Sequence, residues 1–213
     1  MSFLEDNIER IDSDSTDDNV FWSEFNKVTE LLDYDLTEIK KILDSNDTQL
    51  WRRVYYRTFF SYLDGFVYSL GQMFLFFDWF VVDDETEIKI RNKRIIKKKD
   101  NSKILADRFI PINKRLKLVF DSIAKAADTD PIIPSSSSFW TELSITSDVR
   151  NRIVHPKKSE DLFISDNEIE LIHKVGMAFM LATSELLKKR AEAYLDMYDA
   201  MLESAKKTFN QKD

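Results

Sequence analysis

The sequence of 213 residues predicts an all-α fold, and three observations support this class. Apolar residues make up 43% of the chain and aromatic residues 13%, which is enough to form a buried core. The chain contains only 3 glycines and 4 prolines, whereas a strand-rich fold needs a turn roughly every ten residues. Most apolar residues recur at spacings of three and four, the period of an amphipathic helix. We expect a bundle of about five helices with a long C-terminal helix.

The acidic character of the chain is concentrated at its N-terminus. The formal net charge is -7, but residues 1–18 alone hold seven acidic residues and one arginine, a net charge of -6. We interpret residues 1–18 as an acidic mobile tail, residues 19–207 as one helical domain and residues 208–213 as a polar tail. The N-terminal tail has neither the basic start nor the apolar run of a signal peptide, so we expect a cytoplasmic protein.

Two helices are expected at the start of the domain. A helical apolar stripe covers residues 19–45, with a break expected near Asp33 and Asp35. The next helix is expected to run from a cap at residues 46–48 to about Val82. Its residues 65–77 are uncharged, but these 13 residues are too few for a membrane crossing, which needs roughly 20. We therefore interpret this segment as a buried central helix and expect no membrane association.

The sequence changes from mostly apolar to mostly charged residues from Asp83 onward. The alternation of polar and apolar residues from Glu87 to Arg91 predicts a short hairpin. Pro111 suits the first turn of a helix that continues to about Ala127. The following loop, residues 128–138, contains two prolines and four consecutive serines.

Two helices complete the expected fold. Ser137 or Ser138 is expected to cap a helix over residues 139–154, and this helix should end at His155 because the next residue is a proline. The last helix is expected over residues 165–207. At ~1.5 Å per residue it would reach ~60 Å, so its far end must kink, fray or pack against another chain.

All three glycines, Gly65, Gly71 and Gly176, fall within these expected helices. Each should cost ~1 kcal/mol relative to alanine. Two explanations stay open, namely a close approach between helices at these positions and the absence of any structural cause.

Composition restricts the possible chemistry. The chain has no cysteine, which excludes disulfides, thiolate nucleophiles and cysteine-based metal sites. Two histidines are too few for a histidine-rich metal site, and the sequence has no glycine-rich phosphate loop. We therefore expect neither a metal nor another cofactor.

One short segment combines residues that suit catalysis. Arg150, Asn151 and His155 lie together at the expected end of the helix over residues 139–154. In an unbroken helix the side chains of Arg150 and His155 would point ~140° apart. Because Pro156 forces the chain out of the helix, the imidazole can turn back toward the long Arg150 side chain. Asn151, four residues before His155, is placed to orient the ring.

An arginine and a histidine suffice for one metal-free reaction, the cleavage of RNA by its own 2'-hydroxyl. Histidine can remove or supply a proton near neutral pH. Arginine can hold the charge that develops on the phosphate oxygens. A single histidine usually needs a second proton-transfer partner. A symmetric dimer that brings two copies of the motif together would provide one.

At these residues the sequence resembles the HEPN superfamily, whose members carry an Arg, usually a polar residue next to it, and then a His. The resemblance implies an all-helical, dimeric fold and a metal-independent ribonuclease of the toxin, antiphage or RNA-processing type. It implies catalytic roles for Arg150 and His155, a supporting role for Asn151, and an antitoxin or regulatory protein as partner. HEPN proteins often carry an acidic residue that faces the motif, and Asp64 is a possible counterpart.

Other interpretations stay open at this point. Other HEPN proteins are inactive modules that bind a nucleotide or a protein, and a His-Pro pair is also an ordinary helix end. Arg152 is a candidate RNA contact, or a partner of Asp148. Residues 89–103 hold eight Lys or Arg, including Lys97, Lys98 and Lys99, and suit either an RNA-binding surface or a solvated hairpin edge. His173, on the core side of its helix, is interpreted as structural.

Overall fold

A computed structural model describes residues 18–76, 82–99 and 102–210 of this chain. The fold is mostly helical, with 74% helix, which confirms the predicted all-α class. The described residues form six α-helices where about five were expected. In chain order the elements are α2 (Asp18–Ser45), α3 (Gln49–Phe76), α4 (Asp84–Ile90), β1 (Lys93–Lys97), β2 (Lys103–Asp107), α5 (Ile112–Ala126), α6 (Ser138–Val154), the 3-10 helix η1 (Ser159–Leu162) and α7 (Asp166–Asn210).

The N-terminal tail proposed from the sequence lies outside the described residues except for Asp18, whereas residues 208–210 of the proposed C-terminal tail belong to α7. Residues 1–17 and 211–213 are outside the described part of the chain, as are residues 77–81 at the expected end of the second helix. Helix α7 continues to Asn210, three residues further than its expected end at residue 207.

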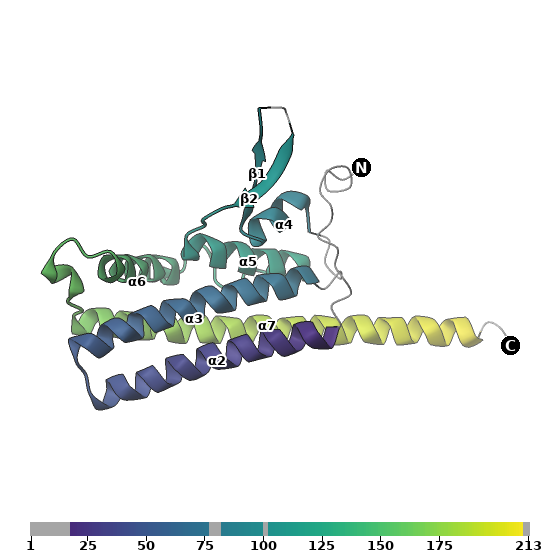
Figure 1. Ribbon diagram of the computed structural model, residues 1–213. Helices are drawn as coiled ribbons and strands as arrows, with labels where there is room; N and C mark the ends of the chain where they lie inside the picture. The colour runs from purple at the N-terminus through teal and green to yellow at the C-terminus, as the bar shows by residue number, and fades with distance from the viewer. Residues whose placement is uncertain (1–17, 77–81, 100–101, 211–213) are drawn as a thin grey trace.

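Helix α3 is the centre of the bundle. Figure 1 shows it between α2 and α7 on one side and α4 and α5 on the other, and it contacts all of these helices and α6. Eleven of its residues are buried, namely Tyr55, Tyr56, Phe59, Phe60, Tyr62, Leu63, Val67, Leu70, Gly71, Met73 and Phe74. The interpretation of this segment as a buried central helix is confirmed. In the part of the chain that the structure describes, no helix has the length and apolar character needed to span a membrane.

Two local expectations were wrong. Helix α2 passes through Asp33 and Asp35 without a break. Residues 87–91 are not a hairpin, because residues 84–90 form α4. The Asp83 side chain caps α4 by accepting a hydrogen bond from the Thr86 backbone N–H at 2.9 Å. The acidic first turn of α4 also suits the positive end of a helix dipole.

The hairpin lies a few residues further along. Strands β1 and β2 pair antiparallel, from Lys93 opposite Asp107 to Lys97 opposite Lys103. Asn92, just before β1, has a positive φ of 55°, a conformation that asparagine tolerates. Its carbonyl accepts a hydrogen bond from the Arg108 backbone N–H at 2.7 Å. The chain therefore enters and leaves the hairpin at one point.

The expected boundaries of α6 are confirmed. The Ser137 side chain accepts a hydrogen bond from the Phe139 N–H at 3.2 Å and caps the helix. At the other end His155 leaves the helical conformation, with φ -124° and ψ 59°. This is the effect expected of the proline that follows it.

Helix α7 has 45 residues, which corresponds to ~67 Å. Figure 1 shows its C-terminal part as one continuous helix that extends past the rest of the bundle.

Two glycines of α3 mark close approaches of other helices. A Cβ atom on Gly71 would lie 2.9 Å from Ile90 Cγ2 of α4 and 3.4 Å from Val119 Cγ2 of α5. A Cβ atom on Gly65 would lie 2.5 Å from Leu32 Cδ1 of α2. Ile90 and Val119 are buried and branched at Cβ, whereas Leu32 is only half-buried and the contact is with the end of its side chain.

We predict opposite effects of alanine at these two positions. Gly71→Ala should lower the free energy of unfolding by about 1–2 kcal/mol, because the crowding of Ile90 outweighs the ~1 kcal/mol gain in helix propensity. Gly65→Ala should be neutral or stabilise by up to ~1 kcal/mol, because Leu32 can turn away. Urea denaturation of the two variants measures this difference. A Gly71→Ala protein at least as stable as Gly65→Ala would contradict the close approach at α4.

Candidate functional site at the end of helix α6

The predicted motif occupies the last turn of α6. Arg150 Nη1 donates a hydrogen bond to Asn151 Oδ1 at 3.1 Å. The His155 backbone N–H donates to the Asn151 carbonyl at 3.0 Å, and the His155 side chain is exposed. Asn151 thus contacts both ends of the motif. Its amide oxygen orients the arginine, whereas the sequence had suggested that it orients the imidazole.

An acidic residue of α3 is within electrostatic reach of the motif. Burial raises the pKa of Asp64, and the positive charge of Arg150 opposes this rise. Arg115 of α5 opposes that rise more strongly, because its Nη2 donates to the Asp64 carboxylate and also to the Asp64 carbonyl at 3.2 Å. Burial is the larger effect, and the pKa of Asp64 is raised.

Asp64 of α3 and Arg115 of α5 form an ion pair, and the positive charge of Arg150 on α6 acts on the same carboxylate. The resemblance to HEPN proteins suggested Asp64, but sequence reasoning missed Arg115. No signal along the chain relates Arg115 to Asp64, because their contact depends on how α5 packs against α3.

Polar side chains at the start of α3 fix the chain that follows the motif. Arg57 Nη2 donates to the Ile153 carbonyl at 3.0 Å, one of the carbonyls that the end of α6 leaves without a helical partner. Gln49 makes two hydrogen bonds with the Ile164 backbone, one from its amide N–H at 2.9 Å and one to its amide oxygen at 2.8 Å. The same Ile164 carbonyl also accepts a hydrogen bond from Arg52 at 2.9 Å, and the Leu162 carbonyl accepts one from Arg53 at 3.0 Å.

Arg152, a candidate RNA contact, is engaged with the protein itself. Its Nη2 donates to the Phe163 carbonyl at 2.8 Å and to Glu168 Oε1 at 3.0 Å. The sequence had suggested Asp148 as an alternative partner, but Glu168 at the start of α7 forms the ion pair. These contacts join the end of α6 to the start of α7.

The lysines predicted to bind RNA are exposed on the hairpin. Lys97 ends β1, and Lys98 and Lys99 follow it. Figure 1 shows the hairpin projecting from the bundle, well apart from the chain that connects α6 to η1. Within one chain the lysines and the α6 motif are therefore separate, and the RNA-binding role of these lysines stays a prediction.

The second histidine is packed against the core. The His173 ring meets Tyr55 edge-on, with ring centroids 5.2 Å apart. Its Nε2 is buried and has no hydrogen-bond partner among the described residues. Burial lowers the pKa of His173, and Lys40 lowers it further. These surroundings are those of a structural residue.

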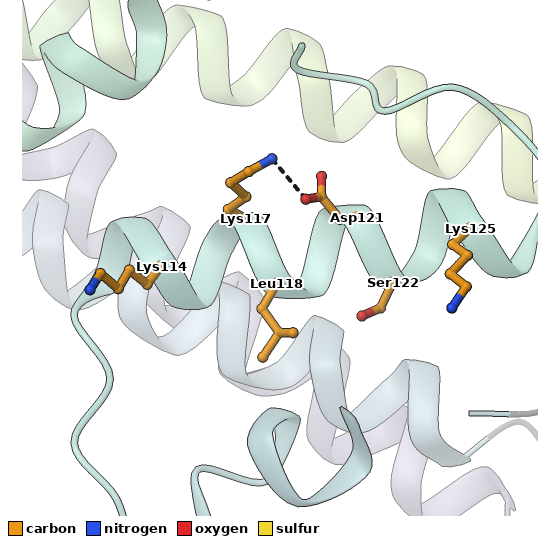
Figure 2. A pocket seen from close by; sticks show the side chains of 6 residues that line it. All are labelled: Lys114, Lys117, Leu118, Asp121, Ser122 and Lys125. Atoms are coloured by element: carbon orange, nitrogen blue, oxygen red, sulfur yellow. Dashed lines mark hydrogen bonds and ion pairs between the residues drawn. The ribbon is translucent and has the colours of Figure 1, made fainter. Parts of the chain in front are cut away.

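A shallow, open depression of about 350 Å³ lies on α5 and was not anticipated from the sequence. Figure 2 shows its six lining side chains, all from this one helix. The Lys117 ammonium group pairs with Asp121 at 2.7 Å and lies 5.4 Å from the Trp140 ring centroid. The helical spacing of the lining residues is visible in the sequence, namely Lys114, Lys117, Leu118, Asp121, Ser122 and Lys125.

In residues 18–76, 82–99 and 102–210, no three His, Asp or Glu side chains come together in a way that could hold a metal ion. Comparison with known proteins adds no relative, since no family model, curated protein or solved structure matches this chain.

We predict that Arg152 contributes to stability. Arg152→Ala should lower the free energy of unfolding by about 1–3 kcal/mol, because the Phe163 carbonyl and the Glu168 carboxylate each lose a partner. Lys157→Ala, in the exposed loop after the motif, should change it by less than ~0.5 kcal/mol. Thermal and urea denaturation provide the measurement, and equal stability of the two variants would exclude this role of Arg152.

Proposed function

We propose that this chain is a metal-independent endoribonuclease of the HEPN-like type, with Arg150 and His155 as its catalytic residues. One observation carries the proposal. Arg150, Asn151 and His155 share the last turn of α6, with His155 exposed and Arg150 held by Asn151. A toxin, antiphage or RNA-processing role would suit such an activity.

The proposed reaction needs a proton-transfer group and a cation. His155 accepts the proton of the 2'-hydroxyl, whose oxygen attacks the phosphorus. The bond from phosphorus to the 5'-oxygen breaks, and this leaving oxygen takes up a proton. Arg150 stabilises the negative charge on the phosphate oxygens as it develops. The products are a 2',3'-cyclic phosphate and a 5'-hydroxyl end.

Asp64 is proposed as a positioning residue. Its carboxylate pairs with Arg115 and acts electrostatically on Arg150, whose guanidinium donates a hydrogen bond to Asn151. In the proposal, the negative charge of Asp64 and the Asn151 amide together orient the arginine, which lowers the entropic cost of binding a phosphate.

A homodimer is part of the proposal, because a second His155 would provide the second proton-transfer group. Large apolar side chains support it, since α7 exposes Met177 at 64%, Leu181 at 67% and Leu195 at 59%, and α2 exposes Leu31 at 58%. Met177 and Leu181 lie one helical turn apart, and neighbouring exposed apolar side chains of this kind favour association with another chain. An antitoxin or other regulatory protein is the second partner proposed.

A non-catalytic module that binds a nucleotide or a protein is the alternative function. The favouring observation is that Arg150 is half-buried and already has Asn151 as a partner, with Asp64 nearby. An arginine engaged in this way can serve to hold the helix end rather than to contact RNA.

The enzyme proposal predicts cleavage of single-stranded RNA in the presence of EDTA. His155→Ala should reduce the rate by about 10²–10⁴-fold, because proton transfer is lost. Arg150→Ala should reduce it by about 10²–10³-fold, because the developing charge is no longer stabilised. Gel analysis of labelled RNA, with identification of the 2',3'-cyclic ends, gives both the rates and the chemistry.

The other histidine provides the matched control. His173→Gln, on the core side of α7, should cleave at the rate of the unmodified protein. Unchanged cleavage by both His155→Ala and Arg150→Ala would refute the site. Binding of RNA without cleavage by the unmodified chain would favour the non-catalytic module.

The dimer proposal predicts that charge on α7 separates the chains. Light scattering should give a dimer mass for the unmodified protein at micromolar concentration and a monomer mass for the variant Met177→Glu with Leu181→Glu. Leu50→Glu, which alters an exposed leucine at the start of α3, should leave the dimer intact. A monomer mass for the unmodified protein would contradict the proposal.

A further inference from the structure

Positive charge in this chain is gathered in one continuous segment. Residues 89–125 hold 13 Lys or Arg and 3 Asp, a net charge of +10, although the whole chain carries -7. This segment includes the β1–β2 hairpin and helix α5, which Figure 1 shows on the same side of α3. The net charge of the chain therefore conceals a strongly basic region.

Part of this charge is neutralised within the fold. Ion pairs engage the side chains of Lys89, Arg91, Lys93, Arg115 and Lys117. The side chains of Arg94, Lys97, Lys98, Lys99 and Arg108 form no ion pair with another described residue. These five cations belong to the hairpin and to the residues at its ends, whereas Lys114 and Lys125, which also form no ion pair with a described residue, lie on α5. The hairpin thus carries most of the charge that remains for a partner.

The hairpin presents cations on both of its faces. Side chains alternate between the faces of a strand, so Arg94 lies on one face and Lys97 on the other. A flexible polyanion can therefore contact cations on either face.

An exposed aromatic residue stands at the base of the hairpin. Phe109 is 90% exposed, the highest value of any large apolar side chain described in this chain. It follows directly after Arg108, whose backbone N–H joins the end of the hairpin to Asn92. A phenyl ring in water beside a cation is suited to stack on a nucleic-acid base.

We propose that the β1–β2 hairpin and the two residues after β2 bind single-stranded RNA. Lys97, Lys98 and Lys99 contact phosphates, Arg108 neutralises the backbone at the base of the hairpin, and Phe109 stacks on a base. Five strand residues at ~3.3 Å each place the lysines about 16 Å from this base, so several nucleotides span the surface. The inference rests on the proposed function for the choice of RNA, but it does not depend on cleavage.

The shape of the surface favours a flexible strand over a lipid bilayer. A bilayer is flat and can meet only one face of the hairpin, whereas Arg94 and Lys97 lie on opposite faces. A single strand can follow both faces. Phe109 also favours single-stranded over double-stranded RNA, because bases in a duplex are already stacked.

The test uses the full chain with His155→Ala, so that binding is measured without cleavage. Fluorescence anisotropy follows a labelled single-stranded RNA of mixed sequence over a range of salt concentrations. Replacing Lys97, Lys98 and Lys99 by Ala should weaken binding roughly 100-fold at about 0.1 M salt and reduce the salt slope by about 2. Phe109→Ala should weaken it roughly 5- to 150-fold with an unchanged slope, and Phe109→Trp should restore it.

Matched controls separate this surface from general charge. The triple variant Lys27→Ala, Lys41→Ala and Lys188→Ala removes the same charge from exposed positions on α2 and α7, and it should bind RNA normally. Equal weakening by both lysine triples, or unchanged binding by the hairpin triple, would overturn the proposal.

Other ligands complete the test. Single-stranded DNA of the same sequence shows whether the protein contacts the ribose 2'-hydroxyl, and equal binding of DNA would overturn the choice of RNA as the ligand. Double-stranded RNA bound as tightly as single-stranded RNA would refute the stacking role of Phe109. Vesicles of phosphatidylserine and phosphatidylcholine bound through Lys97–Lys99 in the absence of RNA binding would reassign the surface to membranes. If RNA binds to the hairpin but is never cut by the unmodified chain, only the proposed catalysis fails.

Discussion

The need to cover helix α3 determines the arrangement of the other helices. Residues 65–76 of this helix carry no charge, and buried aromatic residues continue its apolar surface back to Tyr55. Burial of a large apolar side chain contributes about 1.5–3 kcal/mol, so these residues favour any arrangement that surrounds them. A helix that is apolar on most sides cannot lie at a surface, and α2, α4, α5, α6 and α7 all contact it. Gly71 shows how closely this cover fits, because it leaves no space for a methyl group beside Ile90.

The few polar side chains of α3 position the candidate site. Asp64 acts electrostatically on Arg150, and Arg57 donates a hydrogen bond to the Ile153 carbonyl at the end of α6. Gln49 donates a hydrogen bond to the Ile164 carbonyl and accepts one from the Ile164 N–H. The connection between α6 and α7 is therefore attached to the same rigid helix. The geometry of the motif therefore depends on contacts made by α3 as well as on the sequence of α6. Hydrogen bonds from charged groups contribute about 1.5–3 kcal/mol each, enough to restrict a short connection.

Local signals in the sequence were sufficient for every described α-helix except α4 and for the limits of α6. Ser137 and Pro156 act on their immediate neighbours, so the start and end of this helix could be predicted without knowledge of the fold. The alternation from Glu87 to Arg91 was misleading because α4 is short and both Ile88 and Ile90 are buried, so its apolar residues do not follow a one-sided helical pattern. The pairing of Arg115 with Asp64 and of Arg152 with Glu168 joins distant parts of the chain, and neither has a local signal. The sequence could therefore identify the motif at α6 but not the side chains that surround it.

The hydrogen bond between Arg108 and Asn92 gives the hairpin a modular character. The chain leaves the helices at Asn92 and returns to them at Arg108, so whatever lies between is attached at a single point. Doubling the length of such an insertion costs only about 0.6 kcal/mol in closure entropy. The hairpin can thus be lengthened, shortened or exchanged while α3 keeps its cover. Changes in the sequence or length of the hairpin can therefore occur without changes in the residues that cover α3.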